Sequence, residues 1–254
     1  MSAALVFARK EAVEIVRTWR IWVLPAIILL FAITAPLLAR FTPEIVGAVA
    51  GSQLGGVTLP AGTVFDSSGQ WIKNLSQITL FALIIIYGGI VSSETSSGTA
   101  ILVLTKPMSR AAFVVVKAVI HSMFVAVLAL LGALVTWGLT AAVFGDAPPG
   151  PIWSSTSIWI VLAVFYLAVM TLFSVLIPSA AGAAGAGMGA FVLLTIGALW
   201  KPLGDHSPAG LAGQAAALAA GKPVPDLLSP VLVSLVGAVA LIAAAALLFR
   251  RKEL

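Results

Sequence analysis

The chain has 254 residues, of which 61% are hydrophobic and only 9% are charged, and it contains no cysteine. A soluble domain usually carries about 25% charged residues, so this composition excludes an ordinary soluble protein and indicates an integral membrane protein. The net charge of +5 is spread among apolar segments rather than gathered on one basic face, which argues against a nucleic-acid partner. Without cysteine, neither a disulfide framework nor a thiolate metal site is available.

Before the first long apolar segment, residues 1–20 have the pattern of an amphipathic helix that lies in the membrane surface. The apolar positions recur at steps of three and four and are Leu5, Ala8, Ala12, Ile15, Val16 and Trp19. The polar positions between them are Arg9, Lys10, Glu14 and Arg17. The alternative is a signal peptide, but the apolar run that follows exceeds the usual length of about 7–15 residues and no clear small-residue cleavage site comes after it.

Six apolar segments are long enough to cross a membrane, which requires about 20 residues in a helix. They cover residues 21–39, 75–93, part of 111–144, 157–177, 180–199 and 227–249. The boundary between the fourth and fifth segments rests on the sequence IPSAAG, where Pro178 and Gly182 permit a tight turn. We therefore expect an all-α protein with six spans in a single membrane domain over residues 1–254.

The orientation of the spans follows from the basic residues, because loops rich in Lys and Arg stay on the cytoplasmic side. With both termini in the cytoplasm, all but four of the 14 Lys and Arg residues lie inside, the exceptions being Arg40, Lys73, Lys201 and Lys222. We expect a multi-pass protein of the cell membrane with both termini cytoplasmic. Residues 200–226 would then form an extracytoplasmic loop with short helices.

Ionisable side chains are almost absent between the expected membrane interfaces. Such residues mark ion pathways and proton relays, so their scarcity disfavours a transporter that is driven by protons or sodium. Lys117 and His121 lie in the first turns of the third segment, and we expect them at or below the inner interface.

Enzymatic sites are also poorly supported. Ser174 has no histidine partner at membrane depth, and its hydroxyl is expected to bond back to the preceding helical turn. Asp205 and His206 are an isolated pair, too few for a metal site. Lys222 lies in AAGKPV, which lacks the first glycine and the Ser or Thr of a nucleotide-binding loop.

The fifth segment is rich in small residues, and Gly185 and Gly189 have the GxxxG spacing that lets helix backbones approach closely. We expect a tight helix contact at these two positions. The spacing leaves open whether the contact is made within one chain or between two copies.

The loop over residues 94–110 contains AILVL, an apolar run that is too short to cross a bilayer. Ser96 or Ser97 can cap a short helix by accepting a backbone N–H bond, and Ser109 can cap the long helix that follows. Pro107 disfavours helical geometry at the residue before it and would end the short helix. One face is expected to combine Ala100, Ile101 and Leu104. That face suits either burial against its own bundle or insertion into a groove on a cytosolic partner.

The loop closely resembles the segment between the second and third spans of ABC-2 type transporter permeases, particularly of the NosY-like branch. That segment reads roughly E-x-x-x-G-[ST]-x-x-x-L-L-[ST]-x-P-[VIL]-[ST]-R. The matching residues are Glu94, Gly98, Thr99, Leu102, Leu104, Pro107, Ser109, Arg110 and, beyond the motif, Lys117. Val103 and Met108 are mild departures. The likeness extends to the start ARKEAVEIVRTWR, the six spans and the charged end RRKEL.

The resemblance implies a permease subunit of the type V exporter-like fold that is not itself an enzyme. Two permeases, either identical copies or paralogues, would assemble with two cytosolic ABC ATPase subunits that bind ATP and Mg²⁺. No cofactor or metal is expected on this chain. The residues expected to contact the ATPase are Glu94, Gly98, Thr99, Ile101, Leu102, Leu104, Pro107 and Arg110, with the surface helix beside them. Arg110 could instead anchor a phospholipid at the interface.

The functional expectation is export of a hydrophobic or amphipathic substrate, because the spans are uncharged and rich in small and aliphatic residues. Two alternatives from other classes stay open. One is a secondary transporter or channel that works alone, and the other is a membrane scaffold or sensor that binds a cytosolic protein.

Overall fold

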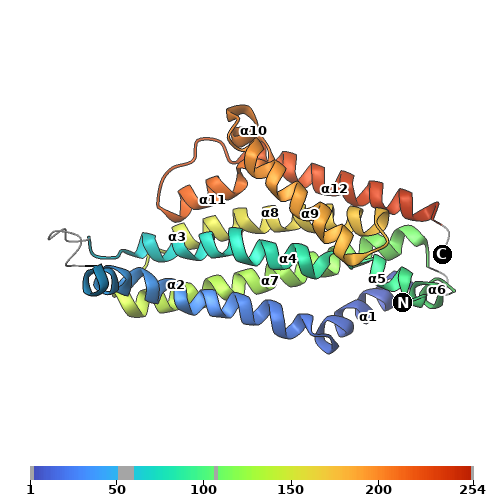
Figure 1. Ribbon diagram of the computed structural model, residues 1–254, viewed down its shortest axis with the longest axis horizontal. Helices are drawn as coiled ribbons and strands as arrows, with labels where there is room; N and C mark the ends of the chain where they lie inside the picture. The colour runs from blue at the N-terminus through green and yellow to red at the C-terminus, as the bar shows by residue number, and fades with distance from the viewer. Residues whose placement is uncertain (1–2, 51–59, 106–107, 253–254) are drawn as a thin grey trace.

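The computed structural model describes residues 3–50, 60–105 and 108–252 of the chain. The described residues form a long helical bundle (Figure 1). Its elements in chain order are α1 (Ala3–Arg17), α2 (Arg20–Ala50), α3 (Val64–Asn74), the π-helical turn η1 (Leu75–Thr79), α4 (Leu80–Tyr87), α5 (Ser92–Ser96), α6 (Thr99–Leu104), α7 (Arg110–Phe144), α8 (Pro149–Leu176), α9 (Ala180–Gly197), α10 (Lys201–His206), the 3₁₀ turn η2 (Pro208–Gly210), α11 (Leu211–Ala219) and α12 (Leu228–Arg250).

Six helical segments in this part of the chain are long and apolar enough to cross a membrane. They are Arg20–Gly47, Val64–Ser96, Arg110–Phe144, Pro149–Leu176, Ala180–Gly197 and Leu228–Arg250. The all-α prediction with six spans is therefore confirmed. The second and fourth segments begin earlier than predicted, because each starts with polar or small residues that a search for apolar runs leaves out.

The second span begins with α3, η1 and α4 in direct succession and, after a turn at residues 88–91, ends with the short helix α5. It starts with a capping box, in which Thr63 accepts the N–H of Asp66 and the Asp66 carboxylate accepts the N–H of Thr63. The turn between the fourth and fifth spans covers residues 177–179, and Ser179 caps α9 by accepting the N–H of Gly182. Gly182 thus lies inside α9 and not in the turn.

The centre of the bundle is α8, which contacts α12, α11 and α7. Its Trp159 is fully buried, and its Thr156 accepts a 3.0 Å hydrogen bond from the indole of Trp71 on α3. Between membrane helices such close packing supplies most of the association energy, since lipid is as apolar as the side chains. Large apolar side chains on the outside, such as Leu193 of α9 at 71% exposure, form the surface that faces lipid or other chains.

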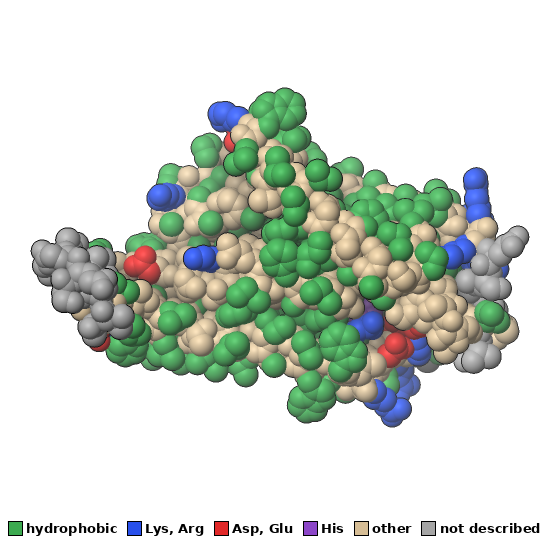
Figure 2. All heavy atoms as spheres, viewed as in Figure 1, with side chains coloured by type: hydrophobic (Ala, Val, Ile, Leu, Met, Phe, Trp, Pro, Cys, Tyr) green, Lys and Arg blue, Asp and Glu red, His purple; other side chains and the backbone are tan. Residues whose placement is uncertain are grey.

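The two ends of the bundle differ. One end carries α1, α5, α6 and both termini of the chain (Figure 1), and we call it the α6 end. The part of the molecule away from the α6 end is here called the far end; it comprises the last turns of α2 and the start of α3 at the opposite tip, together with the α10–α11 region on the side of the bundle (Figure 1). Figure 2 shows hydrophobic side chains along the length of the visible face, with many charged side chains near the α6 end.

Candidate functional site

The short helix α6 is separated from α5 by Gly98, which has a φ of 74°. This left-handed conformation is one that glycine adopts without steric cost, and it is the usual way to end a helix such as α5. The prediction that Ser96 or Ser97 caps α6 is wrong, because its N-cap is Gly98 and no side chain bonds there. Ser109 does cap α7 as predicted, with its hydroxyl accepting the N–H of Ala112 at 3.1 Å.

The α6 helix has one buried and one exposed side. Ala100 is fully buried and Val103 packs against the core, whereas Ile101 is 47% exposed. The prediction that Ala100 and Ile101 share one face is therefore wrong. The side chains of Leu102 and Leu104, and Pro107 altogether, fall outside what the structure describes.

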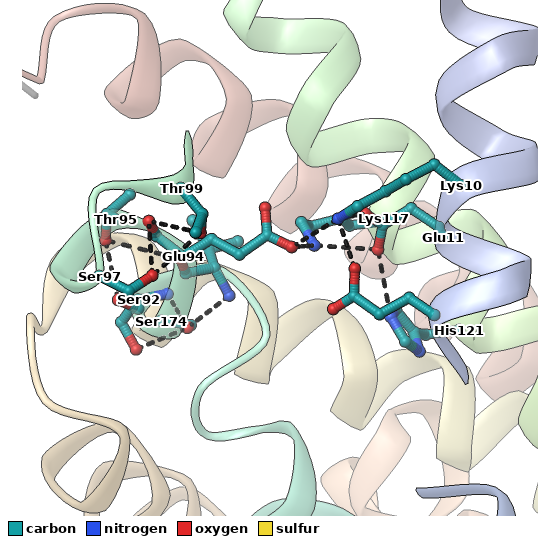
Figure 3. Close-up of polar contacts among 12 residues, drawn as sticks. Lys10, Glu11, Ser92, Glu94, Thr95, Ser97, Thr99, Lys117, His121 and Ser174 are labelled. Atoms are coloured by element: carbon teal, nitrogen blue, oxygen red, sulfur yellow. Dashed lines mark hydrogen bonds and ion pairs between the residues drawn. The ribbon is translucent and has the colours of Figure 1, made fainter. Parts of the chain in front are cut away.

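Beneath the loop lies a network of charged side chains from three helices (Figure 3). Lys117 of α7 donates to Glu94 of α5 at 2.7 Å and to Glu11 of α1 at 2.9 Å. Lys10 of α1 donates to the same two carboxylates, each at 2.9 Å, and also pairs with Glu14. The two ammonium groups thus bridge α1, α5 and α7, which are far apart in the sequence.

The core of this network is withdrawn from solvent. The side chains of Lys117 and Glu11 are only 2% and 1% exposed. Phe7 and Phe113 stack at 5.2 Å between ring centroids, and the Lys117 ammonium lies 5.2 Å from the Phe113 ring centroid. Because apolar rings exclude water, each charge depends on its partner, and removing one partner would leave an uncompensated buried charge.

The environment of Glu11 holds it in the ionised form. Burial alone would raise the pKa of this carboxyl, but the neighbouring His121 imidazole and the charge of Lys117 outweigh it and lower the pKa to about 2. For Lys10, burial would lower the pKa, but hydrogen bonds to the three carboxylates raise it above its ordinary value. Glu11 and Lys10 are thus both held in their charged forms.

The network reaches two further helices through His121 of α7. Its Nε2 lies 3.6 Å from the Glu11 carboxylate, and its ring meets the edge of the Tyr87 ring on α4 at 5.1 Å. The Arg20 guanidinium at the start of α2 lies 5.9 Å from the centroid of the same Tyr87 ring. Five helices therefore converge on this point of the α6 end.

The structure brings together only some of the predicted site residues. Glu94, Lys10 and Glu14 join the network, and Thr99 donates to the Glu94 carbonyl at 3.3 Å. Arg110 lies elsewhere and donates to the carbonyls of Lys252 and Arg250 at the end of α12.

Arg9 and Arg17 of α1 are exposed. The predicted apolar row of residues 1–20 is also mostly exposed, at Leu5, Val16 and Trp19, whereas Ile15 is buried. An apolar surface at these positions remains available to a membrane.

Sequence reasoning missed Glu11. It lies four residues after Phe7 and four before Ile15, and these three side chains form the buried edge of α1. A carboxylate in the middle of an apolar i, i+4 row was the available signal, since such a position is rarely buried without a partner.

The predicted helix contact at Gly185 and Gly189 has no counterpart in the described part of the chain. A side chain added at either glycine would meet no atom within 4 Å, and both are exposed. The buried small residues of α9 are Ala183 and Gly187, and a Cβ added at Gly187 would lie 2.4 Å from Met170 Sδ. The GxxxG face of α9 thus points away from its own bundle.

Comparison with known proteins agrees with this architecture. The family model described as ABC-2 family transporter protein matches residues 5–218. No curated protein matched the chain. The match covers well over half of the chain, including α1, the loop and five of the six spans, and so the chain belongs to the ABC-2 family of transporter proteins.

Proposed function

We propose that this ABC-2 transporter membrane component is a permease subunit of the NosY-like branch that is powered by a separate cytosolic ATPase. In this proposal the α6 end faces the cytoplasm, both termini are cytoplasmic, and α6 is the coupling helix. The predicted contact residues of the loop keep their proposed role, and ATP and Mg²⁺ are bound by the partner.

The observation that carries the proposal is the combination of an exposed apolar residue on α6 with a rigid base below it. Ile101 is exposed while its neighbour Ala100 is fully buried. The base is fixed to α1 and α7 through the ion pairs of Glu94. A groove on a partner can bind a small apolar side chain of this kind. Because α6 is held firmly by its base, a movement of the partner would displace the attached helices and would not merely deform the loop.

A second permease copy or a paralogue is part of the proposal. The outward GxxxG face of α9 supports it, since Gly185 and Gly189 leave room for a helix backbone from another chain. Two such permeases would present two α6 helices, one for each ATPase subunit.

For the substrate we propose a hydrophobic or amphipathic molecule that is exported. Support comes from the apolar spans and from a cavity of about 700 Å³ at the α10–α11 region. Its lining mixes polar side chains, such as Lys201, His206 and Asp226, with apolar ones such as Leu199. A pocket of this kind suits a molecule that has both polar and apolar surface.

The first test is purification of the tagged chain from its native membranes, followed by identification of bound proteins and an ATPase assay. The proposal expects a nucleotide-binding protein in the complex and ATP hydrolysis that the chain alone lacks. Recovery of the chain without any nucleotide-binding protein would contradict it.

A sharper test places a charge on the exposed side of α6. Ile101→Asp should reduce ATPase binding by about tenfold or more, because an apolar anchor would be replaced by a charge that must be desolvated in the groove. Ser96→Asp adds the same charge to the same loop at an exposed position of α5 and should change binding much less. Equal binding by the Ile101→Asp variant and the wild type would show that this face is not the contact.

A further inference from the structure

The second span is interrupted directly before the loop. Helix α4 ends at Tyr87 and α5 begins at Ser92, with residues 88–91 in turns between them. Gly88 and Gly89 pack against the start of α9, where a Cβ on Gly88 would lie 2.5 Å from the Ala180 carbonyl oxygen. Because a side chain at this position would collide with backbone, the close approach requires glycine.

The interruption leaves backbone donors without partners from the span itself, and Ser174 of α8 accepts two of them. Its hydroxyl oxygen accepts the N–H of Val91 and the N–H of Ser92, each at 2.9 Å. It also donates to the Ser92 hydroxyl at 3.2 Å. The predicted bond from Ser174 to its own helix is therefore wrong. Ser174 acts as a cap for α5 that is supplied by another span.

The contact between Ser174 and α5 is fully enclosed. Ser174 and Ser92 are both at 0% exposure. A buried N–H that loses its acceptor suffers the full cost of desolvation, so Val91 and Ser92 depend on this one hydroxyl. Two residues further on, Glu94 is held by Lys117 of α7 and Lys10 of α1. Helix α5 is thus bonded to α1, α7 and α8, whereas residues 88–91 connect it to α4.

Helix α8 extends from this contact to the far end. Ser174 lies in its last turn, whereas Thr156 bonds Trp71 of α3 nearer its start, and α11 packs against α8. A continuous helix of 28 residues moves as a rigid element, so a displacement at Ser174 would reach the α10–α11 region.

We propose that Ser174 is a positioning residue that transmits movement of α5 and α6 to α8, with residues 88–91 as the hinge that lets α5 move relative to α4. This inference rests on the proposed function, in which an ATPase moves α6. The movement then reaches the far end through the fourth span and not along the second span to which the loop belongs.

The test uses a single reporter cysteine, which is possible because the chain has none of its own. Ser157→Cys places it at an exposed position in the half of α8 that faces the far end. Its rate of reaction with a maleimide is measured with ATP and without ATP, in the complex of the chain with its co-purified ATPase. Ser174→Ala should leave ATPase binding intact. It should reduce the ATP-dependent change in rate by roughly fivefold or more, which is the lower end of the effects that coupling between two sites usually produces.

Ser155→Ala is the matched control, because it makes the same substitution in the same helix. Ser155 is fully buried and donates only to the Ile152 carbonyl of its own helix, at 3.1 Å. The Ser155→Ala variant should show the same ATP-dependent change in reaction rate as the Ser157→Cys protein without further substitution. An unchanged response in Ser174→Ala, or an equal loss in Ser155→Ala, would overturn the inference.

Hydrogen exchange gives a readout that does not depend on the ATPase. In Ser174→Ala the amides of Val91 and Ser92 should exchange about tenfold faster, since they lose their acceptor. If the chain without the Ser174 substitution binds no ATPase, the proposed function fails. Hydrogen exchange would still report whether Ser174 stabilises the start of α5. Unchanged exchange at both amides would overturn the role of Ser174 itself.

A disulfide provides a second variant in case Ser174→Ala does not fold. Ser92→Cys combined with Ser174→Cys replaces two hydroxyl groups whose oxygens are 3.2 Å apart. If α5 and α8 move together, ATP hydrolysis by the complex should continue when this disulfide is closed. Loss of hydrolysis on oxidation, with recovery on reduction, would mean that the two helices must separate and would refute the inference.

Discussion

The two ends of the molecule use charge in different ways. At the α6 end, Lys117 and Glu11 are almost fully buried and join helices that are distant in sequence. At the far end, Arg40 pairs with Glu44 and Lys201 pairs with Asp205, each four residues along one helix and exposed to solvent. Exposed pairs of this kind contribute little to stability, whereas a buried network fixes the relative positions of its helices. The difference indicates that geometry is controlled tightly at the α6 end.

Removing the central cation should have the largest effect. Lys117→Met removes the more buried of the two ammonium groups that Glu11 and Glu94 share, and it should lower the free energy of unfolding by about 3–5 kcal/mol. Thermal unfolding of the purified protein in detergent measures the loss. Adding Glu11→Gln to the same variant should recover part of it, and a double variant that is less stable than Lys117→Met would contradict the ion-pair account.

Acidification tests the same network without a change at Lys117. The pKa of Glu11 is about 2 in the folded protein against an ordinary value of 4.5. The stabilisation that comes from its ionised form is therefore complete above pH 4.5 and is lost as the pH falls from 4.5 toward 2. Unfolding midpoints measured over this range should fall less steeply in Glu11→Gln than in the wild type. Parallel curves would show that Glu11 is not held in this way.

A smaller effect on stability is expected when alanine replaces glycine, and its sign should differ between a left-handed turn and a regular helix. Gly98 has a φ of 74° with open space around it, so Gly98→Ala should introduce backbone strain of about 1 kcal/mol or slightly more and no collision. Gly185→Ala, in the regular helix α9 with equally open space, should be neutral or stabilising in the isolated chain. Hydrogen exchange in α6 measures the first change, and equal protection of α6 in both variants would argue against the left-handed turn.

The smallest effect should come from the far end. Lys201→Met removes a cation whose side chain is 85% exposed, and it should change stability by no more than about 0.5 kcal/mol. It is matched to Lys117→Met in the residues exchanged. If both variants lost similar stability, the contrast between the two ends would be unfounded.

The elements that could be predicted from the sequence are those fixed by local chemistry. Apolar length identified the six spans, and Ser109 could be recognised as a cap because a cap bonds only two or three residues ahead. The start of α6 was predicted wrongly, because the sequence SSG contains both serines that can cap a helix and a glycine that can form a left-handed turn. Which of the two is used depends on how α5 ends.

The parts that sequence reasoning missed depend on partners far away in the chain. Glu11 and Lys117 are separated by 106 positions, and Ser174 meets Ser92 across 82 positions. An i, i+4 pattern indicates which side chains share a face, but it does not tell which helix will lie opposite. Glu11 therefore looked like one more polar residue of a surface helix, and Ser174 looked like a hydroxyl bonded to its own turn.

The central claim is that the exposed side of α6 contacts a cytosolic ATPase. The most direct measurement replaces Ile101 with cysteine, attaches a photo-crosslinker to it and irradiates native membranes. A crosslink from position 101 to a nucleotide-binding protein, with none from the same probe at position 157 on α8, is the result that this account predicts. Two results would contradict it. One is labelling of the unmodified cysteine at position 101 by a membrane-impermeant thiol reagent added outside intact cells. The other is a crosslinker at position 101 that attaches to no ATPase.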